Sequence, residues 1–359
     1  MDILVKDTNF NNVAVIDTYK SLIWTDRYNQ CGDFELHLPV RQEFLESLKE
    51  DNYLQIKDSE HAMIVQDISV DSDAEEGNSL TITGKSLETI LERRIVWGQK
   101  IITGNLQDGL ETLFNEAIIS PTIPERKIDN FIFLKSDDPR ITELTIDAEY
   151  TGDDLYTIVT NICVEHNIGF KLVLNDDNRF VFSLYSGEDR SYNQTENPYV
   201  VFSPKFENII NSNYYTSKAN YRNVTLVAGE GDEYRYRQTV VVGSASGLDR
   251  REIFTDASSV QQDSEEATLS NAEYLSVLET EGSKTLNDHK ISSAFEGEVE
   301  TTQTYKFGKD YFVGDTVQIA NEYGHEGTAY ISELIISHSE TGVSIYPTFT
   351  KVEEKEDES

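Results

Sequence analysis

Apolar and polar residues alternate along much of the chain, which is typical of strands with one buried face. In residues 32–39, Phe34, Leu36 and Leu38 are separated by polar neighbours, and this period of two predicts a half-buried strand. The same pattern predicts further N-terminal strands at residues 13–16, 22–24, 53–56, 62–70 and 80–83, with a turn at 71–78. Short strands separated by turns favour a β-barrel or a β-sandwich.

A second pattern, with apolar residues every three or four positions, predicts helices. It is clearest in residues 153–167, where Leu155, Ile158, Val159 and Ile162 share one face. Further helices are predicted at residues 41–49, 86–94, 106–119 and 264–289. The sequence Ser-Asn-Ala-Glu at residues 270–273 has the spacing of a capping box.

Strand patterns return after the central helices, so two β-rich regions enclose a compact α+β insertion. The insertion contains strands at residues 169–174 and 179–185 around a hairpin turn at 175–178. Later strands are predicted at residues 221–228, 234–242, 299–307, 316–319, 329–336 and 343–349, with a second hairpin turn at 229–232. The fold class expected from this order is α+β with strands dominant.

Composition supports a folded chain with little internal methionine. The chain has 359 residues, 38% of them hydrophobic, with 19 Tyr and 16 Phe, which are enough bulky side chains to build cores. Cys31 and Cys163 belong to no metal or disulfide pattern and are expected to be buried thiols. We expect a soluble protein, because there is no signal peptide and no apolar stretch near the roughly 20 residues that span a bilayer.

The charge is strongly negative, since 30 Lys and Arg oppose 65 Asp and Glu, for a net charge of −35. Such a surface repels phosphate, which excludes sequence-specific nucleic-acid binding. Two interpretations remain open: the charge keeps the protein soluble, or it forms a surface past which a polyanion slides without sticking.

No catalytic, cofactor or metal motif is found. The chain lacks nucleophile-elbow, P-loop and dinucleotide-binding sequences, and no two of its six histidines are spaced four residues apart (His37, His61, His166, His289, His325 and His338). Residues 7–11 superficially resemble a calcium loop, but Asn12 and Thr18 occupy the positions that need Gly and Glu, so a turn is expected. Pairs of carboxylates arise by chance among 65 acids and indicate no site.

One charged hairpin leaves two interpretations open. Glu230 and Asp232 precede Arg235 and Arg237, which lie on one face of the next strand. The four side chains form either an interfacial charge pair or a solvated ladder, and we favour the ladder because surface ion pairs contribute little to stability.

Several segments, in order along the chain, resemble the siphophage tail hub or baseplate hub proteins, the group of tail-tip proteins that includes the N-terminal part of Tal. The segments are WTDR and GDFEL near residue 30, GKSL and LERR near residue 90, GDDL at 152–155, YRNV at 221–224, GLDRRE at 247–252 and VGDTV at 313–317. The positions that carry the resemblance are Trp24, Arg27, Gly32, Phe34, Glu35, Gly84, Arg93, Arg94, Tyr221, Arg222, Gly229, Arg250, Arg251, Gly314 and Asp315.

The resemblance implies a fold of two tube-like β-barrels and two decorating domains, with three copies in a ring. The corresponding division is a first barrel at residues 1–95, an inserted α+β domain at 96–204, a second barrel at 205–245 and 296–352, a decorating segment with an acidic helix at 246–295, and a disordered acidic tail at 353–359.

The resemblance also implies a function without catalysis: a structural hub that closes or extends the tail tube and guides DNA and the tape-measure protein toward the host. Implied partners are two further copies of the chain, the distal tail ring protein, the C-terminus of the tape-measure protein and receptor-binding or lytic tail-tip proteins. DNA would pass through the channel without specific binding, and the protein would be assembled in the host cytoplasm and located at the virion tail tip.

The positions that carry the resemblance also have structural explanations. Gly32 and Gly314 precede strands, where turns often need unusual φ angles, Trp24 offers a core anchor, and Arg27 is suited to holding a carboxylate in a bidentate pair. Two alternatives remain: a cell-wall hydrolase with a carboxylate site, and a carbohydrate-binding module. Family members often carry a lytic C-terminal extension, and because this sequence stops at residue 359 a hydrolase is the less expected alternative.

Overall fold

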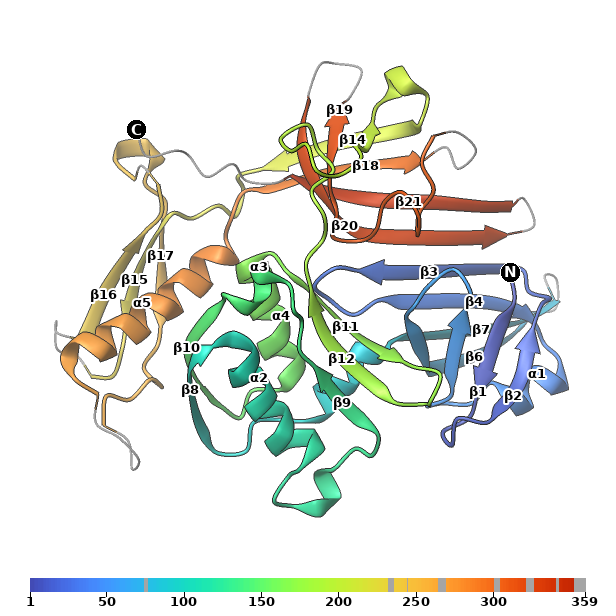
Figure 1. Ribbon diagram of the computed structural model, residues 1–359, viewed down its shortest axis with the longest axis horizontal. Helices are drawn as coiled ribbons and strands as arrows, with labels where there is room; N and C mark the ends of the chain where they lie inside the picture. The colour runs from blue at the N-terminus through green and yellow to red at the C-terminus, as the bar shows by residue number, and fades with distance from the viewer. Residues whose placement is uncertain are drawn as a thin grey trace. The chain divides into compact units, whose positions relative to one another are not determined.

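The computed structural model (Figure 1) describes residues 1–73, 77–231, 236–243, 245–263, 269–299, 304–320, 326–339 and 342–351. The chain forms two compact units, one of Met1–Asn213 with Phe295–Ser359 and the other of Tyr214–Ala294. In the described chain, no helix is both long and apolar enough to cross a membrane.

The N-terminal strands form one antiparallel arrangement in the order β3-β4-β7-β6-β5-β1-β2. Their side chains alternate between the core and the outer face, as the period-two pattern predicts: Phe34, Leu36 and Leu38 of β4 are all buried. A short helix, α1 (Gln42–Ser47), follows β4. The strands are β1 (Ile3–Lys6), β2 (Asn12–Ile16), β3 (Ser21–Arg27), β4 (Asp33–Pro39), β5 (Tyr53–Ile56), β6 (Ala62–Asp73) and β7 (Gly77–Ser86).

The C-terminal strands continue the same sheet, as the contact of red β20 with blue β3 shows (Figure 1). The first part of β20 pairs with β19, and residues 333–339 pair with β3, so this long strand joins the two β-rich regions. Both regions also share one hydrophobic core, which includes Trp24 and Phe349. The strands are β13 (Val201–Phe202), β14 (Ile209–Ser217), β18 (Ser292–Val299), β19 (Thr316–Ala320), β20 (Glu326–Ser339) and β21 (Gly342–Lys351).

The two tube-like β-barrels implied by the resemblance stay a prediction, and what the described strands form is one joined sheet. Among the described strands, neither β-rich region closes on itself, and the sheet order runs unbroken from β14 to β2. The reason is the length of β20, which leaves part of one edge free to pair with β3 after β19 has ended. Sequence periodicity identifies a strand but carries no information about which distant strand pairs with it.

The insertion between the two β-rich regions has its own core of aromatic and aliphatic side chains. Helix α4 (Leu155–His166) begins at Asp154, whose carboxylate caps Thr157 N, and ends at Asn167 with φ +50°. Strand β8 (Gln99–Asn105) pairs with β10 (Thr145–Thr151), and β12 lies between β9 and β11. The other elements are η1 (Leu87–Arg93), α2 (Leu106–Phe114), η2 (Asn115–Ile119), η3 (Pro124–Arg126), β9 (Phe131–Leu134), α3 (Pro139–Thr142), β11 (Gly169–Leu174) and β12 (Phe180–Tyr185).

The second unit is a three-stranded sheet with one helix on it. Strand β15 (Val224–Ala228) lies between β16 (Arg237–Val241) and β17 (Glu252–Asp256). Helix α5 (Asn271–Asn287) packs Tyr274 and Leu278 against Val227 and Val240 of this sheet. Ser270 and Glu273 form the capping box that the sequence predicts.

The strand-dominated α+β class and most predicted elements are confirmed, with three corrections. Of the turn predicted at 71–78, residues 71–73 belong to β6 and residues 77–78 to β7, while residues 74–76 lie outside the described chain. Helix α5 begins at Asn271, after its N-cap Ser270, and residues 264–268 of the helix predicted at 264–289 lie outside the described chain. The strand predicted at 299–307 overlaps β18, which lies between β14 and β21, only at Val299; residues 300–303 lie outside the described chain, and residues 304–307 belong to no named strand. Residues 353–359 lie outside the described chain, and the proposed domain limits stay a prediction.

Candidate functional site

The densest group of ionisable side chains lies inside the first unit, around Glu88 of η1. Glu88 Oε1 accepts hydrogen bonds from His61 Nδ1 (3.0 Å) and from Leu172 N (2.9 Å). The Asp26 carboxylate accepts hydrogen bonds from Trp24 Nε1 (3.2 Å) and from the Ser59 hydroxyl. Because His61 directly precedes β6 and Leu172 lies in β11, this group connects the N-terminal sheet to the insertion.

Burial and charge shift the pKa values of this group in opposite directions. Burial by itself lowers the pKa of His61, but the charges of Glu88 and Asp26 outweigh it and raise that pKa to about 9. For Glu88, burial acts to raise the pKa, and His61 outweighs it and leaves the pKa lowered. Burial raises the pKa of Asp26, with His61 only partly opposing it. His61 and Glu88 are therefore a charged pair in the folded protein near neutral pH.

This group contains Ser, His and two acids, yet it lacks the geometry of a hydrolase. Ser59 donates its hydroxyl to Asp26, and its oxygen accepts from the backbone N–H of His61, not from the imidazole. Glu88 is 1% exposed and Asp26 is 4% exposed, so a substrate has no access to them. A serine nucleophile needs a base that accepts its proton and a substrate that reaches both, whereas here the imidazole makes no hydrogen bond to Ser59 and both carboxylates are buried. No group of three or more metal-binding side chains is found within the described residues.

A second junction surrounds the ring of Tyr28, just after β3. A Cβ on Gly169 or Gly314 would overlap this ring, and one on Gly187 would overlap the carbonyl of Gly314. Gly314 also has φ +96°, a conformation that side chains rarely adopt. The three glycines come from different parts of the chain, so their lack of side chains lets the insertion and the C-terminal strands reach one aromatic ring.

Hydrogen bonds from both backbone and side chain hold Tyr28 at this junction. Its N–H donates to Ser332 O (3.0 Å) in β20, and its carbonyl accepts from Phe170 N (3.2 Å) in β11. Its hydroxyl donates to Asn167 O and accepts from Gly187 N, both at 3.2 Å. Burial raises the pKa of this hydroxyl to about 12, so it remains protonated and able to donate.

Arg27, next to Tyr28, joins two carboxylates from distant strands. Its Nε donates to Glu333 of β20 (2.5 Å), and an Nη atom donates to Asp33 of β4 (2.6 Å) and to Cys31 O (3.0 Å). Arg27 was expected to form a bidentate pair with one carboxylate, and it instead bridges two carboxylates. Burial acts against the charged form, but Asp33 and Glu333 outweigh it and raise the pKa of Arg27.

Asp315 connects the loop after β12 to the C-terminal strands through hydrogen bonds. It is 2% exposed and accepts from Glu188 N (2.8 Å), Arg190 Nε (2.6 Å) and Phe312 N (3.0 Å). Burial raises its pKa, and Arg190 only partly opposes this. The side chain thus satisfies three donors at a point where two segments distant in sequence meet.

The other N-terminal positions that carry the resemblance lie in the same sheet. Trp24 and Phe34 are buried neighbours with ring centroids 6.1 Å apart, and Glu35 pairs with His37 on the outer face. Gly32 lacks the positive φ expected of it. Its constraint is instead close approach, because a Cβ there would overlap Thr25 O, as one on Gly84 would overlap Ile64 O.

Five further positions that carry the resemblance belong to the second unit: Tyr221, Arg222, Gly229, Arg250 and Arg251. Gly229 leaves room for the hydroxyl of Tyr274. The Arg251 guanidinium lies 5.9 Å from the ring centroid of Tyr221, the Arg222 backbone N–H donates to His289 O, and Arg250 pairs with Glu252. The shared role of these positions as family landmarks stays a prediction.

The charged hairpin of this unit lies partly outside the described chain, which includes neither Asp232 nor Arg235. Arg237 donates to the carbonyls of Gly229 and Gly231, and Glu230 accepts from Gln262 N (3.3 Å). The described members of the hairpin therefore bind backbone groups.

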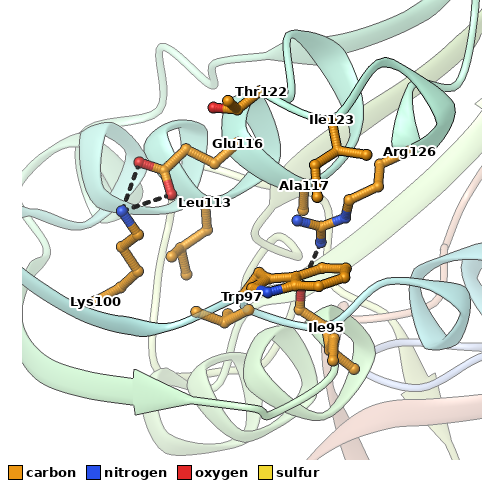
Figure 2. Close-up of a pocket in the computed structure, with 10 residues that line it drawn as sticks. Ile95, Trp97, Lys100, Leu113, Glu116, Ala117, Thr122, Ile123 and Arg126 are labelled. Carbon is orange, nitrogen blue, oxygen red and sulfur yellow. Dashed lines mark hydrogen bonds and ion pairs between the residues drawn. The ribbon is translucent and has the colours of Figure 1, made fainter.

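A pocket opens on the surface of the insertion, between the segment after η1 and the turns that follow α2 (Figure 2). Its volume is about 280 Å³, and Trp97, Ile95 and Ile123 form its exposed apolar wall. The Arg126 guanidinium lies over the Trp97 ring, 5.1 Å from the centroid, and donates to Ile95 O (2.6 Å).

Sequence patterns did not single out Tyr28, His61, Glu88, Trp97 or Arg126. The available signals were that Tyr28 directly follows Arg27, which carries the family resemblance, and that Trp97 is one of only two tryptophans. Which side chains become buried together depends on pairing between distant segments, and sequence periodicity does not report that pairing.

Solved structures share this fold along nearly their whole length. A prophage tail protein, gp18, from Listeria monocytogenes is 14% identical, with a TM-score of 0.55 and coverage of 98% of this chain and 96% of that one. A 43 kDa tail protein of prophage MuSo2 from Shewanella oneidensis is 13% identical, with a TM-score of 0.60 and 98% of each chain covered. A tail protein from Neisseria meningitidis is 12% identical, with a TM-score of 0.58, over 98% of this chain and 96% of that one.

Comparison with curated proteins returned no similar sequence. The family of Siphovirus ReqiPepy6 Gp37-like proteins matches residues 1–350, nearly the entire chain and both of its units. This chain therefore belongs to the Siphovirus ReqiPepy6 Gp37-like protein family.

Proposed function

We propose that the protein is a structural hub of a phage tail tip, in which three copies form a ring that guides DNA and the tape-measure protein toward the host. The observation that carries the proposal is the match of residues 1–350 to a siphovirus family, together with a fold shared with prophage tail proteins over nearly full length. The described interior of the first unit supports a structural role, since its charged side chains connect segments that are distant in sequence.

The ring would present an acidic channel wall. The net charge of −35 supports this, because Lys and Arg on a channel wall would hold DNA through counterion release. An acidic wall would let DNA pass, while buried apolar contacts between copies would have to offset their mutual repulsion. The distal tail ring protein and the end of the tape-measure protein are the neighbours proposed for such a hub.

The mass of the purified protein in solution, measured by light scattering, tests the ring. We expect a species of three times the monomer mass at high protein concentration, and electron microscopy of the assembled tip should show threefold symmetry. A different symmetry, or a channel wall formed mainly by Lys and Arg, would contradict the proposal.

The proposed absence of catalysis is tested separately, on peptidoglycan and on soluble polysaccharides. We expect no hydrolysis by the purified protein, because Ser59 makes no hydrogen bond to the His61 imidazole and Glu88 is buried. Turnover that disappears when a single Asp or Glu is replaced would identify an enzyme and contradict this part of the proposal.

A further inference from the structure

The side chain of Trp97 is unusually exposed for its type. It is 64% exposed, while Trp24 is fully buried. Ile95 and Ile123 at the same pocket are 46% and 39% exposed. Tryptophan buries more apolar surface than any other side chain when it is covered, and it is enriched at the centres of protein interfaces. An exposed tryptophan between two exposed isoleucines therefore forms an apolar surface suited to covering by a partner.

Two arginines beside this surface lack a carboxylate partner in the described part of the chain. Arg126 donates to Ile95 O, while Arg94 donates to the carbonyls of Arg126 (2.8 Å) and Arg93 (2.8 Å). Partial burial and the neighbouring charges of Arg126 and Arg93 lower the pKa of Arg94. In a chain that has 65 acids for 30 bases, two adjacent arginines whose hydrogen bonds within the described chain go to backbone carbonyls form a local positive site.

The pocket is of a size that fits a side chain. Small-molecule sites usually enclose about 300–1,000 Å³, and this open pocket of about 280 Å³ lies just below that range. The cation at its far end is already neutralised, since Lys100 pairs with Glu116 at 3.0 Å (Figure 2). Uncompensated positive charge is thus confined to the end where Arg126 covers Trp97.

We propose that this surface binds a short acidic segment of another protein, with one apolar side chain of the segment in the pocket beside Trp97 and its carboxylates on Arg94 and Arg126. Arginine binds carboxylates through a planar fork of donors, and Arg and Trp are the residues that most often dominate interface energies. A short segment suits this site better than a second copy of the chain, because a second copy would bring a further net charge of −35.

Fluorescence of Trp97 provides a direct measurement on the purified full chain. The chain has two tryptophans, and the other, Trp24, is 0% exposed, so a probe at the pocket changes mainly the emission of Trp97. The probe is the blocked peptide Asp-Glu-Leu-Asp-Glu, titrated at low salt. We expect a saturable blue shift that weakens as NaCl is raised, because the contacts include charge pairs.

Three further probes test separately the contributions of the apolar side chain, of negative charge and of a polypeptide backbone to binding. The peptide Asp-Glu-Ser-Asp-Glu lacks the apolar side chain and should bind more weakly, while Lys-Lys-Leu-Lys-Lys should not bind. A single-stranded oligonucleotide should also leave the emission unchanged. Equal binding of the lysine peptide, tighter binding of the oligonucleotide, or no blue shift at millimolar acidic peptide would each overturn the proposal.

Substitution of the two arginines tests whether they bind the carboxylates of the peptide. Arg126→Gln and Arg94→Gln should each weaken binding of the acidic peptide by about tenfold. The matched control is Arg179→Gln, which alters an exposed arginine of the same insertion, at the β11–β12 turn, outside the pocket lining. Circular dichroism and the melting temperature confirm that each variant is folded. Unchanged affinity in both pocket variants would overturn the proposal.

Light scattering of the same variants separates this surface from the proposed ring. If Arg94→Gln or Arg126→Gln abolishes self-association of the chain, the surface is an interface between copies and the proposal is wrong. Loss of peptide binding with an unchanged oligomeric mass supports it, whether or not the chain forms a trimer.

Discussion

Single residues connect segments of this protein that are far apart in sequence. Glu88 binds both His61 and a backbone N–H of β11, and the half-buried Arg27 bridges two carboxylates from different strands. Breaking a buried pair by removing one partner leaves an uncompensated charge, which costs about 3–5 kcal/mol. The buried His61–Glu88 pair is therefore a position at which a single substitution has a large effect on stability.

The His61–Glu88 pair makes stability depend on pH. The folded pKa of His61 is about 9, above its ordinary value of 6.5, so its contribution is complete below pH 6.5 and is lost as the pH rises through 9. His61→Gln should lower the free energy of unfolding by about 3 kcal/mol at pH 6, and by less at pH 9.5. Urea unfolding at both pH values measures this.

The control for this prediction is His166→Gln, at the end of α4 and outside the buried group. It should leave the pH dependence unchanged. An effect of His61→Gln that is equally large at both pH values would show that the imidazole acts by packing and not by charge.

Substitution of Gly314 distinguishes the cost of a strained backbone conformation from the cost of a steric overlap. Gly314→Ala places a Cβ against the Tyr28 ring at φ +96°, whereas Gly152→Ala meets a similar φ of +82° with no atom within 4 Å. In both variants alanine is forced into an unfavourable positive φ, but only Gly314→Ala also overpacks the junction around Tyr28. The free energy of unfolding of Gly314→Ala should therefore be about 2 kcal/mol lower than that of Gly152→Ala. Equal melting temperatures would show that the Tyr28 ring shifts without cost.

Strand β20 and helix α5 are positioned by different kinds of interaction, one between distant segments and one local. Strand β20 is positioned by its pairing with β3, β19 and β21, which come from both ends of the chain. Helix α5 begins where local chemistry dictates, at the Ser270–Glu273 capping box. The sequence predicts the capping-box motif but places it inside a helix that begins at residue 264, and it indicates no position for β20 in the sheet.

The N-cap of α5 allows a prediction about the stability of that helix. Ser270→Ala removes the acceptor for Glu273 N (3.3 Å) and should destabilise the start of α5 by about 1 kcal/mol. Hydrogen exchange at the first turn of α5 should accelerate. Ser276→Ala, at an exposed position inside the same helix, is the matched control and should not accelerate it, because Ala favours helix. Equal exchange rates in the two variants would contradict the role of the cap.

At the scale of the whole molecule, net charge sets the conditions for assembly. A chain of −35 repels its own copies over about 10 Å at 0.1 M salt, and over shorter distances as salt is raised. Apolar contacts between copies act only at close range and are much less screened. Repulsion and attraction therefore respond differently to ionic strength.

Association of the chain with itself should accordingly strengthen with salt. Raising NaCl from about 0.05 M to about 0.3 M shortens the screening length and should shift the equilibrium toward the proposed trimer. Sedimentation equilibrium at a series of salt concentrations measures the shift. Dissociation on adding salt would mean that charge pairs, and not apolar contacts, dominate the interface.

The sequence by itself determined the local elements and the class of this protein. Period-two alternation identified β4, helical spacing identified α4, and the Ser270–Glu273 motif identified the cap of α5, because each depends on neighbours only a few residues apart. The ordered motifs also indicated a siphophage tail family, in agreement with the family to which the chain belongs.

Only the tertiary structure decided how distant parts meet. The pairing of β3 with β20, the insertion of Tyr28 among glycines from three segments and the buried His61–Glu88 pair all join residues that lie far apart in sequence. Periodicity records which side of an element is apolar but not which element will cover it. For the same reason the exposure of Trp97 was decided by packing, since an apolar side chain has the same sequence signature whether it is covered or left at the surface.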